Sequence, residues 1–287
     1  MTETSARDRQ AVITEAAIAA ARAQIGIELP SRGQFNDYAT VDTIRHFAYG
    51  TGDPNPLFAD PEYAATTRWG GMIAPAPFLF TCMGSFPWGM PGVHALWCGA
   101  EFECHAPIRA GARIVTTVCL SDVQEKRSDF TGRGVMQTWT FTHRDGEGAL
   151  LAKTRLWMLR TERDTARERG KYREIQPPHY ADAELAAIEE WYDREELRGG
   201  RPRYWEDVVE GEELAPVLKG PLTVTDLIGF KVGWGFRPFV MPNRIGWEYR
   251  RRHPGLTSKN EQGIWDVPER VHWDTDFARF VGATTAS

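Results

Sequence analysis

The chain has 287 residues, enough for one large domain or two of ordinary size. Its composition, 42% hydrophobic and 25% charged, is that of a globular protein, and a net charge of -5 argues against a surface that binds nucleic acid. No apolar run approaches the roughly 20 residues that span a membrane, and MTETSARDRQ lacks the apolar core of a secretion signal, so we expect a cytoplasmic protein.

The sequence also argues against several kinds of active site. Its four cysteines show neither a CxxC pair nor zinc-finger spacing, which predicts free thiols, most of them buried, and no metal site; they are Cys82, Cys98, Cys104 and Cys119. There is no GxGxxG, Walker, HExxH or GxSxG motif, so nucleotide-driven, zinc-protease and serine-hydrolase chemistry lack support.

The first half of the chain begins with helical patterns. Residues 8–26 predict an amphipathic helix that Gly26 closes. Thr40 or Asp42 is placed to cap a second helix, which carries on one face Ile44, Phe47 and Ala48.

Two more helices are expected after the stretch GDPNPLF. Asp60 followed by Pro61 is an N-cap and an N1 proline, so a helix begins there. The segment APFLFTCMGSFPW, residues 76–88, predicts a long buried helix because nearly all of it is apolar.

The pattern then changes to strands. From residue 95 to 160 apolar and polar residues alternate, with breaks at Ala110–Gly111, near Gly132 and at Asp145–Gly146. This pattern predicts an antiparallel meander. HRDGEGALLAK indicates a hairpin, since Asp-Gly tolerates the positive φ of a tight turn.

A charged segment follows, and then the opening pattern returns. Residues 161–203 predict a linker with a helix closed by Gly199–Gly200. PLTVTDLIGFKVGWG repeats YATVDTIRHFAYGTG, and RVHWDTDFARFVGA aligns with PLFADPEYAATTRWGG after a long insertion. The second alignment pairs His272 with Phe58 and Asp274 with Asp60. This weak internal repeat predicts two related units.

The stretch GDPNPLFADPEYAATTRWGGMIAP, with the apolar segment and APIRAGARI after it, resembles the MaoC-like or (R)-specific enoyl-CoA hydratase family of hot-dog proteins. Within that family it is similar to the FAS1-like dehydratase branch. The resemblance implies an α+β hot-dog fold, in which an antiparallel sheet wraps a long helix, with the first hot-dog complete and the second repeat partial. It also implies hydration of a trans-2-enoyl thioester, or the reverse dehydration, with no cofactor beyond the CoA of the substrate.

In that family the motif is an Asp, four residues and a His, with an Asn between them. Such a pair can hold a water, deprotonate it and return a proton, while backbone N–H groups stabilise the charge on the thioester oxygen. Asp53 and Asn55 match, Phe58 stands at the His position, and Ala76 lies in the loop that matches the oxyanion hole. We expect these four to bind substrate; loop bracing by Asp53 and Asn55 and a stiff helix entry at Ala76 are the alternatives.

The second copy restores the missing base, because His272 falls at the catalytic His position. Asp266 lies six residues upstream, where the motif has five. We therefore predict that His272 and Asp266 form the acid/base pair. The alternatives are an ordinary surface or interfacial histidine and a loop carboxylate.

The second copy stops at Ser287, just inside its helix. A hot-dog that lacked its sheet would leave apolar surface uncovered. The strands could come from another polypeptide, the segment could lie over the first unit, or the chain could be truncated. We favour the first alternative: a hot-dog domain at 1–160, a linker at 161–203, and a partial repeat at 204–287 that a small hot-dog partner subunit completes.

These features predict a component of an enoyl-CoA hydratase or 3-hydroxyacyl-thioester dehydratase that acts on a bulky acyl-CoA, as the large subunit of a heteromer. The competing hypothesis is a non-catalytic acyl-binding or scaffold subunit that supports a catalytic hot-dog partner. A hot-dog thioesterase fits less well, because it places its acid differently. The segment EYRRRHPG, residues 248–255, could hold the phosphates of CoA, although a solvated loop is the commoner explanation.

Overall fold

A computed structural model of the chain describes residues 12–84, 89–90, 93–128, 132–162, 179–235, 241–253 and 257–281. Its largest element is an antiparallel sheet in the order β1-β5-β6-β7-β3. These strands are β1 (Glu28–Pro30), β3 (His94–Cys104), β5 (Val115–Ser128), β6 (Gly132–Arg144) and β7 (Leu150–Thr161). Two short pairs are formed by β2 (Ile73–Ala74) with β4 (Ile108–Arg109), and by β8 (Ser258–Lys259) with β9 (Trp265–Asp266).

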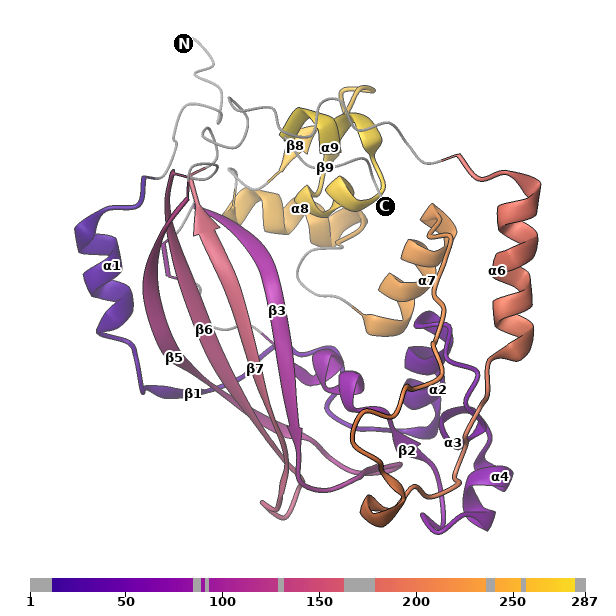
Figure 1. Cartoon of the computed structure of the whole chain (residues 1–287). Helices are drawn as coiled ribbons and strands as arrows, with labels where there is room; N and C mark the ends of the chain where they lie inside the picture. The colour runs from indigo at the N-terminus through magenta and orange to yellow at the C-terminus, as the bar shows by residue number, and fades with distance from the viewer. Residues whose placement is uncertain are drawn as a thin grey trace.

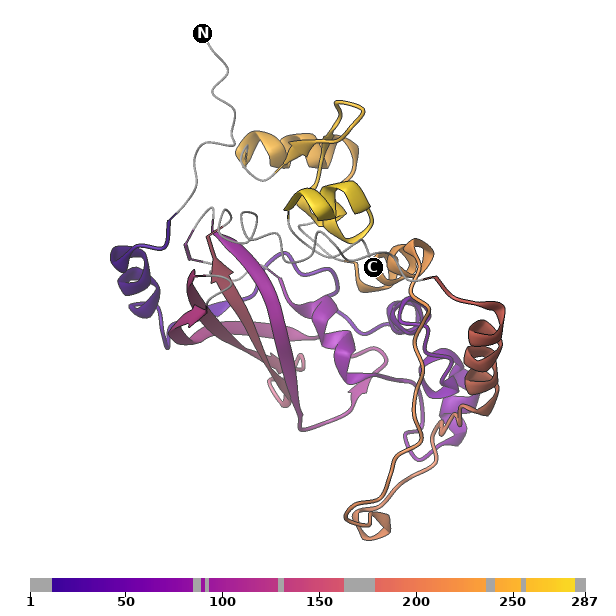
Figure 2. The same ribbon diagram turned by 45° about the horizontal axis from the view of Figure 1, so that its top comes forward.

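The helices lie on one side of this curved sheet, apart from α1 at its far edge (Figure 1). In the first half they are α1 (Glu15–Arg22), α2 (Val41–Gly50), α3 (Pro56–Ala59), α4 (Pro61–Thr66) and the 3-10 helix η2 (Ala76–Cys82). In the second half they are α6 (Asp182–Arg194), η3 (Trp205–Asp207), α7 (Val224–Trp234), α8 (Asn243–Arg252), η4 (Pro268–His272) and α9 (Thr275–Val281). Both views place α7 beside α2, and α8 and α9 near one end of the sheet (Figures 1 and 2).

The predicted meander is confirmed. β5, β6 and β7 are neighbours in the sheet, and every second residue of β6 from Val135 to His143 is buried. The hairpin after β6 lies where Asp145–Gly146 predicted it, but Gly148, at φ 93°, adopts the left-handed conformation. Oδ1 of Asp145 accepts hydrogen bonds from the N–H groups of residues 147 and 149, at 2.9 and 2.8 Å. The turn is therefore a longer loop that the aspartate braces.

Two predicted helices are shorter than the sequence pattern indicates. α1 ends at Arg22, and Gly26 instead donates its N–H to the Leu120 carbonyl (3.0 Å), which brings the chain to the edge of the sheet. The apolar segment after Pro75 forms η2 and not a long α-helix. It ends at Cys82 because Met83 is extended, and Gly84 then donates its N–H to Ser31 Oγ (2.8 Å), a contact that sequence spacing does not reveal. Residues 85–88 of the predicted helix lie outside the described residues.

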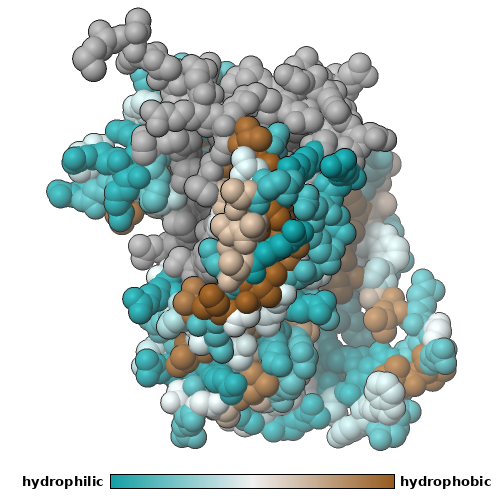
Figure 3. Space-filling model, turned by 90° about the vertical axis from the view of Figure 1, so that its left-hand side faces the viewer, coloured by the Kyte–Doolittle hydropathy of each residue, from teal (hydrophilic) through white to brown (hydrophobic). Residues whose placement is uncertain are grey.

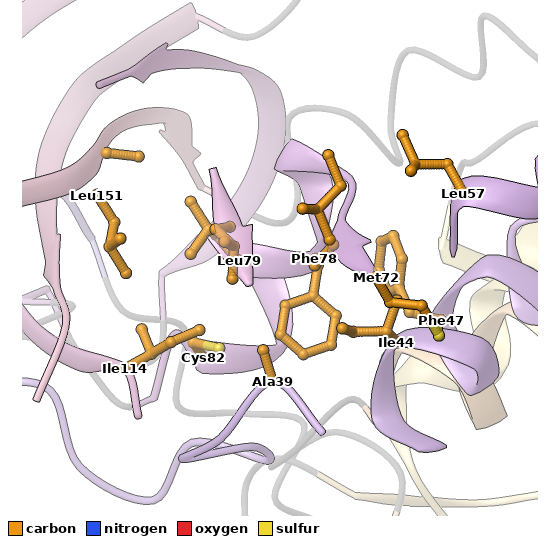
Figure 4. Packing of buried hydrophobic residues seen from close by; sticks show 14 of the residues in the cluster. Ala39, Ile44, Phe47, Leu57, Met72, Phe78, Leu79, Cys82, Ile114 and Leu151 are labelled. Carbon is orange, nitrogen blue, oxygen red and sulfur yellow. The ribbon is translucent and has the colours of Figure 1, made fainter. Parts of the chain in front are cut away.

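The hydrophobic core consists of two clusters. In the first, η2 packs between α2 and the sheet. Figure 4 shows the side chains of η2 among those of α2 and of the sheet. Its members include Ile44, Phe47, Phe78, Leu79, Cys82, Ile114 and Leu151. The second cluster joins the sheet to α1, and includes Ile18, Leu120, Trp139 and Leu156. The predicted apolar face of α2 is confirmed, since Ile44, Phe47 and Ala48 are all buried.

The cysteines are free, as predicted, but the expectation that most are buried is wrong. Cys82 is buried in the first cluster, where loss of solvent raises the pKa of its thiol to about 12. Cys98 and Cys104 are exposed and Cys119 is intermediate, because all three lie on sheet strands beyond the core clusters.

Three buried polar residues lie side by side on neighbouring strands, near the end of the sheet where the β6–β7 hairpin turns. His143 of β6 lies between Thr116 of β5 and Thr154 of β7, with each ring nitrogen 3.0 Å from a threonine Oγ1. Burial lowers the pKa of His143 to about 4, so its imidazole is neutral at pH 7. The two hydroxyls satisfy both ring nitrogens of a histidine that the apolar surroundings would otherwise penalise.

The linker contacts the first unit. α6 ends at Arg194, so Gly199 and Gly200 do not close it as predicted. Gly200 donates its N–H to the hydroxyl of Tyr63 on α4 (2.9 Å), and a Cβ on Gly199 would lie 2.3 Å from that oxygen. The two glycines therefore allow the chain to pass closely over α4. The charged part, residues 163–178, lies outside the described residues, and the division at residues 160 and 203 stays a prediction.

The internal repeat is visible in the helix caps. Thr40 caps α2 and Thr223 caps α7, each in a capping box with the third helical residue. Asp60 caps α4, and its counterpart Asp274 accepts from the N–H of Phe277 (2.8 Å) at the start of α9. The two copies thus begin their helices in the same way.

α2 and α7 cross at matching positions of the two copies. A Cβ on Gly50 of α2 would lie 2.7 Å from both Cα of Gly233 and the carbonyl oxygen of Gly229. A Cβ on Gly233 would lie 2.5 Å from the carbonyl oxygen of His46 and 2.8 Å from Cα of Gly50. In the internal repeat Gly50 aligns with Gly233, and His46 aligns with Gly229. Each helix therefore contacts the other through equivalent positions. The two units therefore meet about a local two-fold axis, backbone against backbone.

We predict that Gly233→Ala destabilises the protein by about 1–3 kcal/mol, because the added methyl group must displace backbone atoms of α2. Gly229→Ala is the matched control on the same helix, since its Cβ would meet nothing within 4 Å. Removing a helical glycine there should stabilise by about 0.5–1 kcal/mol. Urea unfolding of the three proteins measures both effects, and equal shifts for the two variants would contradict the close crossing.

Candidate functional site

The turn that holds Asp53 and Asn55 is braced by their own side chains. Oδ1 of Asp53 accepts from the N–H of Asn55 (3.0 Å), and Oδ1 of Asn55 accepts from the N–H of Leu57 (3.0 Å) at the start of α3. The backbone N–H of Asp53 donates to the Ala48 carbonyl (2.8 Å), which fixes the turn to the end of α2. Asp53 thus braces the turn and Asn55 caps α3, while substrate binding by these two residues stays a prediction.

Phe58 occupies the position of the motif's base and belongs to the packing of the first unit. Its ring is half-buried against the first core cluster, so it supplies apolar surface and no proton acceptor. Ala76 begins η2, directly after Pro75, and is also half-buried. Ala76 directly precedes Pro77 and Phe78, and Phe78 belongs to the cluster against which Phe58 packs.

His272 is the last residue of η4, and it lies beside two charged residues. Its Nε2 is 3.6 Å from Oε1 of Glu269, and that carboxylate forms an ion pair with Lys231 of α7. The imidazole is 50% exposed, whereas Lys231 and Glu269 are each only 13% exposed. The site therefore combines a solvent-accessible base with a shielded ion pair.

The pKa of His272 lies below the ordinary histidine value. Partial burial is the main cause, Glu269 raises the pKa, and the positive charge of Lys231 lowers it. An unperturbed histidine has a pKa of about 6.5. Because the pKa of His272 is lower than this, its imidazole is neutral at pH 7. It can accept a proton there.

The contacts of the Asp266 carboxylate are with residues other than His272. Its Oδ1 accepts from the N–H of Val267 (2.7 Å), and its Oδ2 lies 3.9 Å from Nη1 of Arg270. Arg270 is buried, and it also donates to Ser258 Oγ (3.1 Å) and to the carbonyl oxygen of Lys259 (3.2 Å). Asp266 thus helps to hold the β8–β9 hairpin against η4. In the structure, Glu269 is the carboxylate beside His272.

Sequence reasoning missed Glu269 and Lys231. The repeat carried a signal for both, because Glu269 matches Asn55 and Lys231 matches Ala48, so a charged residue replaces a neutral one at each position. Their pairing could not be read from spacing, since 38 residues and an insertion separate them.

Aromatic side chains gather next to this charged group. Nζ of Lys231 lies 5.4 Å from the ring centroid of Trp234, and that ring lies 5.8 Å from Phe80 of η2. Phe80 in turn lies 5.5 Å from Trp97 and 5.0 Å from Phe102, both on β3. These edge-to-face contacts join the sheet of the first unit to α7. A row of aromatic side chains therefore extends from the sheet to the Lys231–Glu269 ion pair, which lies beside His272.

Within the part of the chain that the structure describes, no three His, Cys, Asp or Glu side chains are grouped so that they could hold a metal ion. None of the described helices is both long and apolar enough to cross a membrane.

Parts of the chain are similar to known proteins. Residues 23–154 match the model of the FAS1-like dehydratase domain region. The chain is 30% identical over 112 residues to a UPF0336 protein of Parafrankia sp., covering 36% of this chain and 72% of the relative. It is 28% identical over 151 residues to a probable enoyl-CoA hydratase alpha subunit of Thermomonospora curvata, covering 46% of this chain and 47% of the relative.

Among solved structures, a MaoC-like dehydratase aligns with a TM-score of 0.58 at 19% identity, over 93% of this chain and 73% of that one. The curled antiparallel sheet around η2 and this likeness define an α+β protein of the hot-dog class. The chain belongs to the MaoC-like hot-dog family of hydratases and dehydratases, as its sequence predicted.

We predict opposite effects of the two charged neighbours on the pKa of His272. Lys231→Met should raise it, because a repelling cation is lost and Glu269 is left to stabilise the imidazolium. Glu269→Gln should lower it, because that stabilisation is removed. NMR titration of the imidazole measures both shifts, with His105, which lies 3.0 Å from Glu103 on the surface, as an internal reference signal. Unchanged titration of His272 in both variants would contradict the cluster.

Proposed function

We propose that the chain is a component of an enoyl-CoA hydratase or 3-hydroxyacyl-thioester dehydratase, and that it acts on a bulky acyl group. The observation that carries the proposal is the position of His272. It stands in the second repeat where Phe58 stands in the first, beside a shielded Lys231–Glu269 pair. Membership of a hydratase and dehydratase family supports the same chemistry.

The residues suggest how the reaction would proceed. In hydration, neutral His272 takes a proton from water, the water oxygen bonds to the β-carbon, and the electron pair of the double bond moves toward the thioester oxygen. The imidazolium then returns a proton to the α-carbon. Glu269 stabilises the imidazolium, and Lys231 holds Glu269. Partial burial, with a smaller contribution from Lys231, lowers the pKa of His272 and so favours its action as a base. Dehydration is the same sequence reversed.

The first unit is proposed to hold the acyl group. Phe58 and the aromatic side chains between β3, η2 and α7 offer apolar surface close to the second repeat. Binding sites for large apolar ligands are lined predominantly by such side chains. Asp53 and Asn55 hold the turn that carries Phe58, and Ala76 starts the helix that carries Phe80.

A partner subunit is proposed to complete the second repeat. α7 exposes three apolar residues at helical spacing, Val224, Ile228 and Val232, at 47%, 59% and 71%. The strands in the described part of the second repeat are the two-residue pair β8 and β9. Within that part, no sheet covers the apolar stripe of α7, whereas the large sheet covers the first core cluster. A small hot-dog protein would supply such a sheet.

We predict that His272→Ala lowers kcat for trans-2-enoyl-CoA hydration by about 10²- to 10⁴-fold, the usual worth of a general acid/base. The assay uses the chain together with its partner, and light scattering verifies that the complex still forms. His105→Ala, which removes a histidine from another surface His–Glu pair, should leave turnover unchanged. Full turnover by the assembled His272→Ala complex would overturn the catalytic assignment.

The second candidate function is a non-catalytic acyl-binding or scaffold subunit. Two observations favour it: Asp266 is engaged by Arg270, and Phe58 has replaced the base of the first copy. The same experiment separates the candidates. Unchanged turnover in the assembled His272→Ala complex would mean that the partner carries the complete acid/base pair.

We predict that Ile228→Asp weakens assembly with the small hot-dog partner at least tenfold, because a carboxylate would be desolvated in the middle of the stripe. Ile27→Asp is the matched control. Ile27 is similarly exposed, at 51%, but it lies near α1 and β1, on the other side of the sheet from α7. Apolar residues also gather on that face (Figure 3). The control therefore tests whether a carboxylate at any exposed apolar position would weaken assembly with the partner. Sedimentation of each variant with the partner gives the result; equal weakening would contradict a specific role for α7.

A further inference from the structure

The second repeat carries a group of cations stacked on tryptophans, which the proposed reaction does not use. Cζ of Arg250, in the last turn of α8, lies 5.1 Å from the ring centroid of Trp265 on β9, and Nζ of Lys259 on β8 lies 5.5 Å from the same ring. Cζ of Arg251 lies 5.0 Å from the ring centroid of Trp247, also on α8. We call these five residues the Arg–Trp surface.

The cations of this surface lack a counter-charge within the described chain. No ion pair there involves Arg250, Arg251 or Lys259, although Arg244 at the other end of the same helix pairs with Glu248 at 2.9 Å. A helix C-terminus favours nearby cations, but only weakly at an exposed site. It gives no reason for two tryptophans beside them that remain 44% and 45% exposed. Cations next to half-exposed aromatic rings together suit an anion that carries a planar ring.

The Arg–Trp surface is joined firmly to His272. β9 leads directly into η4, and buried Arg270 of η4 donates to Ser258 Oγ and to the carbonyl oxygen of Lys259, both on β8. Nε of Arg270 also lies 3.7 Å from Oδ2 of Asp274, ahead of α9. Figures 1 and 2 show α8, the β8–β9 hairpin and α9 grouped together near the end of the sheet. A ligand held on this surface is therefore held by the same unit that presents His272.

We propose that the Arg–Trp surface binds the 3′-phosphorylated ADP end of the CoA thioester. Guanidinium groups match phosphate oxygens with paired N–H donors, and a nucleobase can stack on an aromatic side chain. This inference rests on the proposed function, and it narrows the substrate class. A thioester on a carrier protein shares the phosphate of phosphopantetheine, but it has no adenine for the tryptophans to meet.

Binding is tested on the full chain, with its partner where the complex forms. Calorimetric titration with CoA should give a Kd that Arg250→Ala combined with Arg251→Ala weakens at least tenfold. Arg244→Ala, on the same helix, is the matched control and should bind CoA as the wild type does. Adenosine 3′,5′-bisphosphate should compete with CoA, whereas pantetheine should not. Trp265→Leu should weaken binding, and Trp265→Phe should restore part of it.

The kinetic arm separates the two kinds of thioester. The ratio of kcat/KM for an enoyl-CoA to that for the matching enoyl-pantetheine should fall at least tenfold in the double arginine variant. CoA that binds the double variant as it binds the wild type, or fails to bind the wild type, overturns the inference. So does a carrier-protein thioester that is preferred over CoA and is the one weakened by the arginine changes. Calorimetric binding without any hydration would leave this surface assigned and would instead refute the proposed activity.

Discussion

The backbone contact between Gly50 and Gly233 is the constraint on which the rest of the site depends. At this crossing no side chain separates α2 from α7, so neither helix can shift without a clash of main-chain atoms. Lys231 and Trp234 lie on either side of Gly233. Fixing the glycine therefore directs the lysine toward Glu269 and the indole toward Phe80. The charged and the aromatic parts of the site take their relative places from one contact.

The two copies of the repeat have diverged in a coordinated way. Where the first copy has Ala48, Asn55 and Phe58, the second has Lys231, Glu269 and His272. In the first copy these positions serve packing and turn formation. In the second they form one electrostatic cluster, in which each charge has a neighbour of opposite sign. A common backbone thus carries an apolar cluster in one copy and a charged cluster in the other.

The sequence predicted features that depend on residues close together in the chain, and it missed those that depend on distant residues. The caps at Thr40 and Asp60 and the hairpin near Asp145 depend on neighbouring residues, and the structure has all three. After η2 the chain is extended and Gly84 hydrogen-bonds to the distant Ser31, so the apolar pattern predicted too long a helix. The same limit applied at the site. The repeat pointed to His272, but only the fold shows that Asp266 lies beside Arg270 and that Lys231 meets Glu269. The catalytic roles of His272 and Asp266 stay predictions.

The packing of Phe58 restricts how the first copy could change. Its ring is part of a cluster that also contains Leu57, Ile73 and Phe78, so the apolar surroundings have adapted to the absence of an imidazole. A histidine restored at this position would lose solvent without gaining the charged neighbours that Lys231 and Glu269 provide in the other copy. A change of Phe58 alone to histidine would therefore place an imidazole in an apolar cluster, and several neighbouring residues would have to change with it. The difference between the two copies lies in the packing of the core as much as in one side chain.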